Sequence, residues 1–103
     1  MTDQETFEQA ILRSWSEEDG AKSFVLFSSP NCAPCGRFKA AIERLEGAAV
    51  MNVAYVNVYH AAAAAMKTNI RSVPTLVRFS MGRETGRMTG EQTDAKILAF
   101  VDA

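Results

Sequence analysis

The sequence predicts an α/β fold class, with a central mixed sheet of four or five strands flanked by about four helices. Three observations lead to this prediction. Helical and strand-like patterns alternate along the first part of the chain, which is typical of parallel strands joined by crossover helices. A glycine turn then separates two strand-like segments, which adds an antiparallel edge to the sheet. The length of 103 residues suits one hydrophobic core, so we expect a single domain over residues 1–103.

The first half of the chain predicts a helix, a strand and a second helix. Residues 5–15 place apolar side chains three and four positions apart, as in an amphipathic helix, which puts the only tryptophan, Trp15, in the core. Residues 24–27 form a short continuous apolar run, as expected of a strand covered on both faces. A second helical pattern covers residues 34–46, and Gly47 ends it.

The second half predicts a strand, a helix, two strands and a last helix. Residues 50–59 are rich in β-branched and aromatic side chains, which favour a strand. The alanine-rich segment 60–67 is a strong helix former, so we predict a short helix rather than a linker. A strand then begins at Thr75, a turn follows around Gly82, and residues 84–89 form a weak edge strand. The spacing of apolar side chains near the carboxyl end predicts the last helix.

Composition and charge exclude several classes of function. Hydrophobic residues make up 48% of the chain and charged residues 22%, which is typical of a folded globular protein and not of a disordered one. A net charge of -1 gives no bulk attraction to nucleic acid or anionic lipid, and no apolar run is long enough to span a membrane. The N-terminus carries acidic residues where a secretory signal has basic ones. We therefore expect a cytoplasmic protein with no nucleic-acid or membrane partner.

The only two cysteines, Cys32 and Cys35, lie between the first predicted strand and the helix that follows it. Cys32 would sit at the N-terminus of that helix, where unpaired backbone N–H groups lower the pKa of a thiol and favour the thiolate. Pro34 costs little in a first helical turn and fixes the local backbone. Cys35, one turn further on, could attack a mixed disulfide held on Cys32. The pattern predicts a reversible redox pair.

Metal binding is the alternative for this cysteine pair. A structural zinc site needs four ligands, and the two cysteines with the single His60 could complete one only across a dimer or with carboxylates. An iron–sulfur cluster would also need thiols from outside the chain. We therefore assign no metal ligands, and we interpret His60 as a solvated cap at the start of a helix.

Two segments resemble the thioredoxin superfamily. Residues 24–45, FVLFSSPNCAPCGRFKAAIERL, are similar to its active-site strand and helix. Residues 69–90, NIRSVPTLVRFSMGRETGRMTG, are similar to its second signature, an Ile-x-x-x-Pro-Thr loop followed by a strand, a glycine turn, a strand and a glycine. The similarity extends from Phe7 to the last helix, and the two segments together are far more specific than the C-x-x-C motif alone.

The resemblance implies a thioredoxin-like fold and a thiol–disulfide oxidoreductase that exchanges disulfides with protein substrates. Two alternatives stay open, namely a binding or regulatory module on the same fold and a glutathione- or iron–sulfur-linked protein. The resemblance also implies that no cofactor is bound, because electrons would come from a thioredoxin-type reductase or from small thiols. We expect a monomer.

The resemblance further implies roles for individual residues. Cys32 is the expected nucleophile and Cys35 the resolving thiol, with Ala33 and Pro34 shaping their turn. In the family, the proline that matches Pro74 is cis and lies against the cysteines, and the backbone of the residue before it pairs with an extended substrate. The expected substrate-binding residues are Asn31, Val73, Pro74, Thr75 and Gly90. Independently of the resemblance, the basic residues Arg37 and Lys39 follow the cysteine pair and could either add positive potential near Cys32 or simply be solvated.

The chain departs from the family pattern at several positions. Asn31 replaces the tryptophan that usually precedes the first cysteine, so we expect different target proteins. Leu26 replaces a buried aspartate, and Tyr55 replaces the lysine on the neighbouring strand. Without that ionisable pair, deprotonation of Cys35 must depend on water or another group, and we expect slower turnover. Residues 1–4 are too few for the usual N-terminal strand, which favours four strands.

Overall fold

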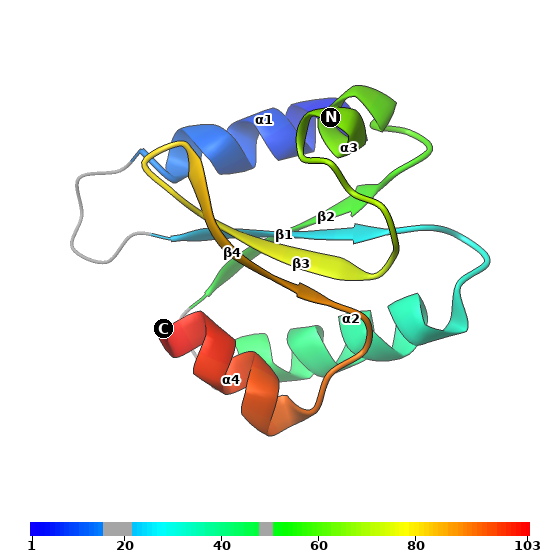
Figure 1. Cartoon of the computed structure of the whole chain (residues 1–103), viewed down its shortest axis with the longest axis vertical. Coiled ribbons are helices and arrows are strands. Elements are labelled where there is room, and N and C mark those ends of the chain that lie inside the picture. The colour runs from blue at the N-terminus through cyan, green and yellow to red at the C-terminus, as the bar shows by residue number, and fades with distance from the viewer. Residues whose placement is uncertain (16–21, 48–50) are drawn as a thin grey trace.

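The computed structural model describes residues 1–15, 22–47 and 51–103 and has a mixed sheet between two layers of helices (Figure 1). The helices and strands follow in the predicted order. They are α1 (Asp3–Arg13), β1 (Ser23–Ser28), α2 (Ala33–Glu46), β2 (Asn52–Asn57), α3 (Ala62–Lys67), β3 (Thr75–Ser80), β4 (Arg83–Thr89) and α4 (Asp94–Asp102). Residue 50, where the second strand was predicted to begin, lies outside the described residues.

The strand order is β2-β1-β3-β4, and within the described residues no strand precedes α1. β1 and β2 are parallel, whereas β3 is antiparallel to both β1 and β4. The sequence prediction of parallel strands is therefore right for β1 and β2 and wrong for β3. A six-residue helix such as α3 rises only about 9 Å, while a strand of similar length spans about 20 Å. After the connection over residues 58–74, β3 begins at the end of the sheet where β2 ends.

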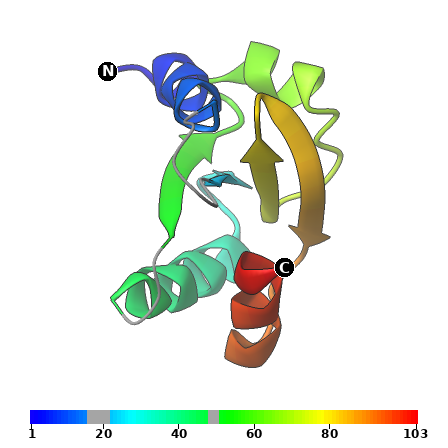
Figure 2. The ribbon, with the colours of Figure 1, turned by 90° about the vertical axis from the view of Figure 1, so that its left-hand side faces the viewer.

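The central strand β1 is buried on both faces, as predicted. Val25 and Phe27 point toward α1 and α3 and join the core cluster on that side. Phe24 and Leu26 point the opposite way, into the cluster beneath α2 and α4. Figure 2 shows the two helical layers on opposite faces of the sheet. Alternate residues of one strand thus anchor both layers, which fixes the position of the loop that follows β1.

The prediction that Trp15 belongs to the core is wrong. Helix α1 ends at Arg13, and the Trp15 side chain is 54% exposed. Its neighbour Ser14 takes the inward position and is fully buried. The Ser14 carbonyl accepts a hydrogen bond from the Met81 amide at 2.7 Å, and the Ser14 hydroxyl accepts one from the Gly82 amide at 2.9 Å. These bonds fasten the β3–β4 turn to the end of α1 and leave the indole lying outside, over Gly82.

None of the helices described combines the length and the apolar character that a bilayer span requires.

Replacing Gly82 by alanine should lower the free energy of unfolding by about 1–2 kcal/mol, because the backbone there is left-handed. The φ angle is +75°, and an added Cβ would lie 2.5 Å from the Trp15 indole. Denaturant titration followed by circular dichroism measures the change. Gly47→Ala is the matched control, since its φ is −72° and its new Cβ would come no closer than 3.6 Å to another atom. Equal losses in the two variants would contradict this account.

Candidate active site

Cys32 caps the N-terminus of α2, as the sequence predicted. Its backbone is extended, with φ −131° and ψ 100°, and Ala33 and Pro34 form the first turn that follows. The Cys32 sulfur accepts a hydrogen bond from the backbone N–H of Cys35 at 3.2 Å. A sulfur in this position faces the unpaired amides of the first helical turn, which stabilise negative charge there.

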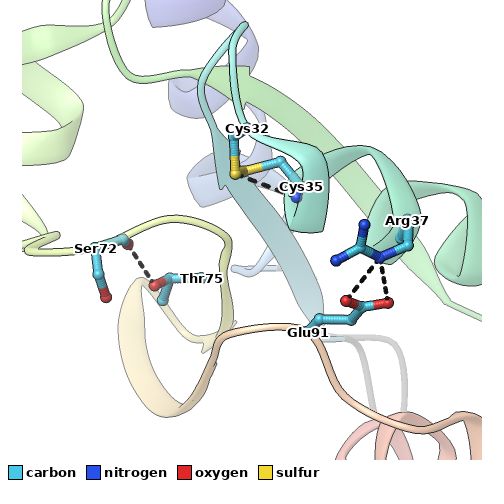
Figure 3. Close-up of a disulfide and its surroundings, with 6 residues drawn as sticks. All are labelled: Cys32, Cys35, Arg37, Ser72, Thr75 and Glu91. Carbon is cyan, nitrogen blue, oxygen red and sulfur yellow. Dashed lines mark hydrogen bonds and ion pairs between the residues drawn. A yellow bond between two sulfur atoms is a disulfide. The ribbon is translucent and has the colours of Figure 1, made fainter.

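Cys32 and Cys35 form a disulfide, with their Cα atoms 5.2 Å apart (Figure 3). The two cysteines differ in exposure. Cys35 is 3% exposed, whereas Cys32 is only partly buried. An incoming sulfur can therefore reach Cys32 more easily than Cys35. Asn31 and Ala33, on either side of Cys32, are exposed.

The Val73–Pro74 peptide bond is cis, as the family resemblance implied. Pro74 is buried, and Val73 is partly exposed. The strand register places Thr75 opposite Phe27 at the end of β1, so the proline loop and the cysteine loop emerge at the same end of the sheet. The amide of Gly90 donates a hydrogen bond to the Pro74 carbonyl at 2.8 Å, which brings a second predicted site residue to this loop.

Two of the predicted substrate-binding residues support the loop from within. Thr75 is 2% exposed, and its hydroxyl donates a hydrogen bond to the Ser72 carbonyl at 2.8 Å. Gly90 has a φ of +84°, a conformation that favours glycine at this turn. The side chain of Thr75 therefore stabilises the loop beneath its surface, while Asn31 and Val73 remain accessible.

The two basic residues that follow the cysteines, Arg37 and Lys39, each contact another side chain. The Nε of Arg37 lies 3.0 and 3.1 Å from the two carboxylate oxygens of Glu91. The ammonium of Lys39 lies 5.1 Å from the centre of the Tyr55 ring. Arg37 is therefore neither simply solvated nor an isolated positive charge, because its Nε pairs with Glu91.

Comparison with known proteins agrees with this geometry. The family model described as Thioredoxin matches residues 1–103. The chain belongs to the thioredoxin family. It is 33% identical to Thioredoxin C-2 of Corynebacterium nephridii over 73 residues, which are 69% of this chain and 68% of that protein.

Solved thioredoxin structures share the fold. A point-mutant thioredoxin of Halobacterium salinarum is 24% identical with a TM-score of 0.76, covering 88% of this chain and 80% of its own. The Fasciola hepatica thioredoxin is 24% identical with a TM-score of 0.77, covering 92% and 88%. The thioredoxin family, its fold and the disulfide-forming cysteine pair support thiol–disulfide oxidoreductase activity, as the sequence predicted.

The chain differs from the usual thioredoxin pattern beneath this site. Leu26 is fully buried in an apolar cluster and faces Tyr55 across the β1–β2 register, so neither strand supplies a carboxylate or an ammonium there. The Tyr55 hydroxyl donates a hydrogen bond to the carboxylate of Glu46. Burial, this hydrogen bond and the charge of Glu46 hold the pKa of Tyr55 well above its usual range. The phenol therefore stays protonated at neutral pH and is not a base.

His60 lies apart from the cysteine loop and is exposed, as predicted, but it does not cap a helix. The N-cap of α3 is Ala61, which makes no side-chain hydrogen bond. The side chain of Gln4 instead accepts a hydrogen bond from the Ala64 amide at 3.1 Å, while His60 lies 3.5 Å from the Asp3 carboxylate. In the parts of the chain that the structure describes, no three side chains of His, Cys, Asp or Glu are grouped to hold a metal ion.

Glu91 is the residue at this site that the sequence interpretation missed. It directly follows Gly90, which the resemblance had already placed beside the binding groove. Its charge is opposite to that of Arg37, which lies two residues after Cys35. Searching for opposite charges next to residues already assigned to the groove would have found the pair.

Replacing Tyr55 by phenylalanine should make stability less sensitive to alkaline pH. In the unfolded chain tyrosine ionises near pH 10, whereas in the folded chain the pKa of Tyr55 is raised. Its contribution is therefore complete below about pH 10 and is lost as the pH rises further. Denaturant midpoints at pH 8 and pH 11 should fall further apart in the wild type than in Tyr55→Phe.

The control is Tyr59→Phe, which removes the same hydroxyl from a ring that is 74% exposed. This variant should show the alkaline loss of the wild type. An identical loss in the wild type and in Tyr55→Phe would rule out the assigned role of the Glu46–Tyr55 contact.

Proposed function

We propose that residues 1–103 form a single thioredoxin-like domain that exchanges disulfides with protein substrates through Cys32 and Cys35. The observation that carries this proposal is the asymmetry of the disulfide. One sulfur caps a helix at the surface, and the other lies one turn further in and is 3% exposed. Such a pair can accept an external sulfur at one atom and close on itself at the other.

The exchange begins in the reduced protein with attack of the Cys32 thiolate on one sulfur of a substrate disulfide. A bond forms between these two sulfurs, the substrate S–S bond breaks, and the second substrate sulfur leaves as a thiolate that takes a proton from water. The Cys35 thiol then loses its proton to solvent and attacks the Cys32 sulfur. The Cys32–Cys35 disulfide forms, the bond between Cys32 and the first substrate sulfur breaks, and that sulfur leaves as a thiolate that takes a proton from water. Two protein thiols are oxidised and one substrate disulfide is reduced, and the same steps reversed oxidise a dithiol.

The residues around the sulfurs hold the substrate in this proposal. Val73 offers its backbone to an extended substrate segment, which would add to the site as a strand adds to a sheet edge. Pro74 sets the position of that backbone and is tied to Gly90 by a hydrogen bond of 2.8 Å. Asn31 is exposed beside Cys32 and contacts the segment on the other side of the nucleophile. Its amide replaces an aromatic surface with a polar one, which favours more polar targets.

The proposal extends to the source of electrons and to the setting. No resident cofactor is required, because a thioredoxin-type reductase or a small thiol such as glutathione can reduce the disulfide again. We propose that the protein works as a cytoplasmic monomer, with neither nucleic acid nor membrane as a partner. Its near-neutral net charge of -1 supports this choice of partners.

A binding or regulatory role on the same fold is the second candidate, and Leu26 favours it. This side chain is fully buried among apolar neighbours, where a thioredoxin usually has a carboxylate that helps the resolving thiol lose its proton. Slow turnover would suit a protein that mainly binds its target. The double variant Cys32→Ser, Cys35→Ser would retain biological activity in that case and lose it if exchange is the function.

The two single cysteine variants should behave differently with a disulfide substrate such as insulin. Cys35→Ser should accumulate a mixed disulfide on Cys32, because the resolving thiol is missing, and mass spectrometry under non-reducing conditions detects it. Cys32→Ser should form almost none, since Cys35 is 3% exposed. Both should lose at least about 100-fold in insulin reduction. Mixed disulfides that form equally in both variants would contradict the assigned roles.

A further inference from the structure

The ion pair between Arg37 and Glu91 borders the cysteine site. Arg37 lies on α2, two residues after Cys35. Glu91 follows Gly90, whose amide is bonded to the carbonyl of Pro74. The pair thus bridges the two segments that flank the disulfide, and in the view of Figure 3 the disulfide lies between this pair and the Ser72–Thr75 loop. A substrate segment that runs from Val73 across the disulfide and continues beyond it would approach these charges.

The contact engages only one edge of the Arg37 guanidinium. Its Nε lies within 3.1 Å of both Glu91 oxygens. Among the described residues, none accepts a hydrogen bond from either terminal nitrogen, Nη1 or Nη2. In Figure 3 both dashed lines to Glu91 start at Nε, and the terminal nitrogens lie on the edge of the guanidinium that is nearer to the cysteine pair. The side chain is 60% exposed, so four N–H donors of a fixed, planar group are open to a ligand.

A second ion pair on the same helix shows a different arrangement. Arg44 contacts both carboxylate oxygens of Asp94 at 2.8 Å through its terminal nitrogen Nη2. Seven residues, or about 10 Å along the helix, separate it from Arg37 on the side away from the cysteines. Both arginine side chains are 60% exposed, and both pairs connect α2 to the segment around α4. Arg44 therefore serves as a matched control, because it makes a similar ion pair but does not lie beside the cysteines.

We propose that Arg37 recognises an acidic side chain close to the disulfide of the protein substrate, and that Glu91 holds the guanidinium for this contact. The inference rests on the proposed function and names the substrates that the same site prefers. A carboxylate can bind the terminal nitrogens while the Glu91 contact stays intact, in the planar geometry that guanidinium and carboxylate favour. A basic substrate residue would have to displace Arg37 from Glu91 first. Because Glu91 offsets part of the charge, the preference is a modest one.

The test uses disulfide-linked peptides that are identical except for one residue beside the cysteine, which is Glu, Gln or Lys. Second-order rate constants for their reduction by the reduced wild-type protein are measured by acid quench and chromatography. We expect the Glu peptide to react about three- to fivefold faster than the Lys peptide, the range that an exposed ion pair supplies. Arg37→Gln should abolish this preference, whereas Arg44→Gln should retain it. Added salt should reduce the preference in the wild type.

Arg37→Lys separates geometry from net charge. Lysine keeps the positive charge but has a single ammonium, which Glu91 would occupy, so its preference should fall close to that of Arg37→Gln. A full preference in this variant would overturn the assignment to the terminal nitrogens. Equal effects of Arg37→Gln and Arg44→Gln, or no preference in the wild type, would overturn the inference as a whole.

The Gln peptide shows whether only the inference about Arg37 fails or whether the proposed disulfide exchange fails too. The wild type and Arg44→Gln should reduce it at similar rates, because the peptide carries no charge and Arg44 lies away from the cysteines. If the wild type reduces the Gln peptide and does not discriminate by charge, only the inference fails. If it reduces none of the three peptides, the proposed function fails as well.

Discussion

Burial of the strand β1 on both of its faces is the constraint on which the rest of the molecule depends. Phe24 and Leu26 anchor one helical layer, and Val25 and Phe27 anchor the other. A strand held in this way cannot shift its register without exposing large apolar side chains to water. The loop that leaves it is therefore presented at a fixed place. Because the proline loop enters β3 at the same end of the sheet, the cysteine loop and the proline loop emerge together there.

The sequence was sufficient for most of the fold because its signals are local. The helices and strands follow from periodicity, and the cap at Cys32 follows from a cysteine placed just before a proline-containing first turn. The direction of β3 was not predictable from its own pattern, since it depends on how far the preceding helix carries the chain. Trp15 was misassigned for a similar reason. An indole fits the apolar periodicity of α1, but the helix ends two residues earlier, where hydrogen bonds from a distant turn seat Ser14 instead.

The candidate site likewise combines features that local sequence patterns predict with features that depend on distant contacts. The cysteines and the proline loop have signatures in the sequence, and the resemblance to a family joined them. The contacts of Arg37 with Glu91 and of Tyr55 with Glu46 bring together residues whose pairing no local pattern encodes. The Arg37–Glu91 contact borders the site, whereas Glu46 is the last residue of α2, at the other end of the helix from Cys32. The motifs in the sequence therefore predict the cysteine pair and the proline loop, whereas these two side-chain contacts depend on the tertiary fold.

The place of Trp15 has a practical consequence. It lies over the turn at one end of β3, and the disulfide lies beyond the other end, so a strand of six residues, about 20 Å long, stands between them. A disulfide quenches indole emission only at short range, and Asn31 occupies the position next to Cys32 where an indole would sense it. Intrinsic emission from this protein should therefore report unfolding while staying silent to oxidation. Oxidation of the cysteines should therefore leave the tryptophan fluorescence unchanged. Following the redox state in solution requires a reporter group placed at the sulfurs themselves.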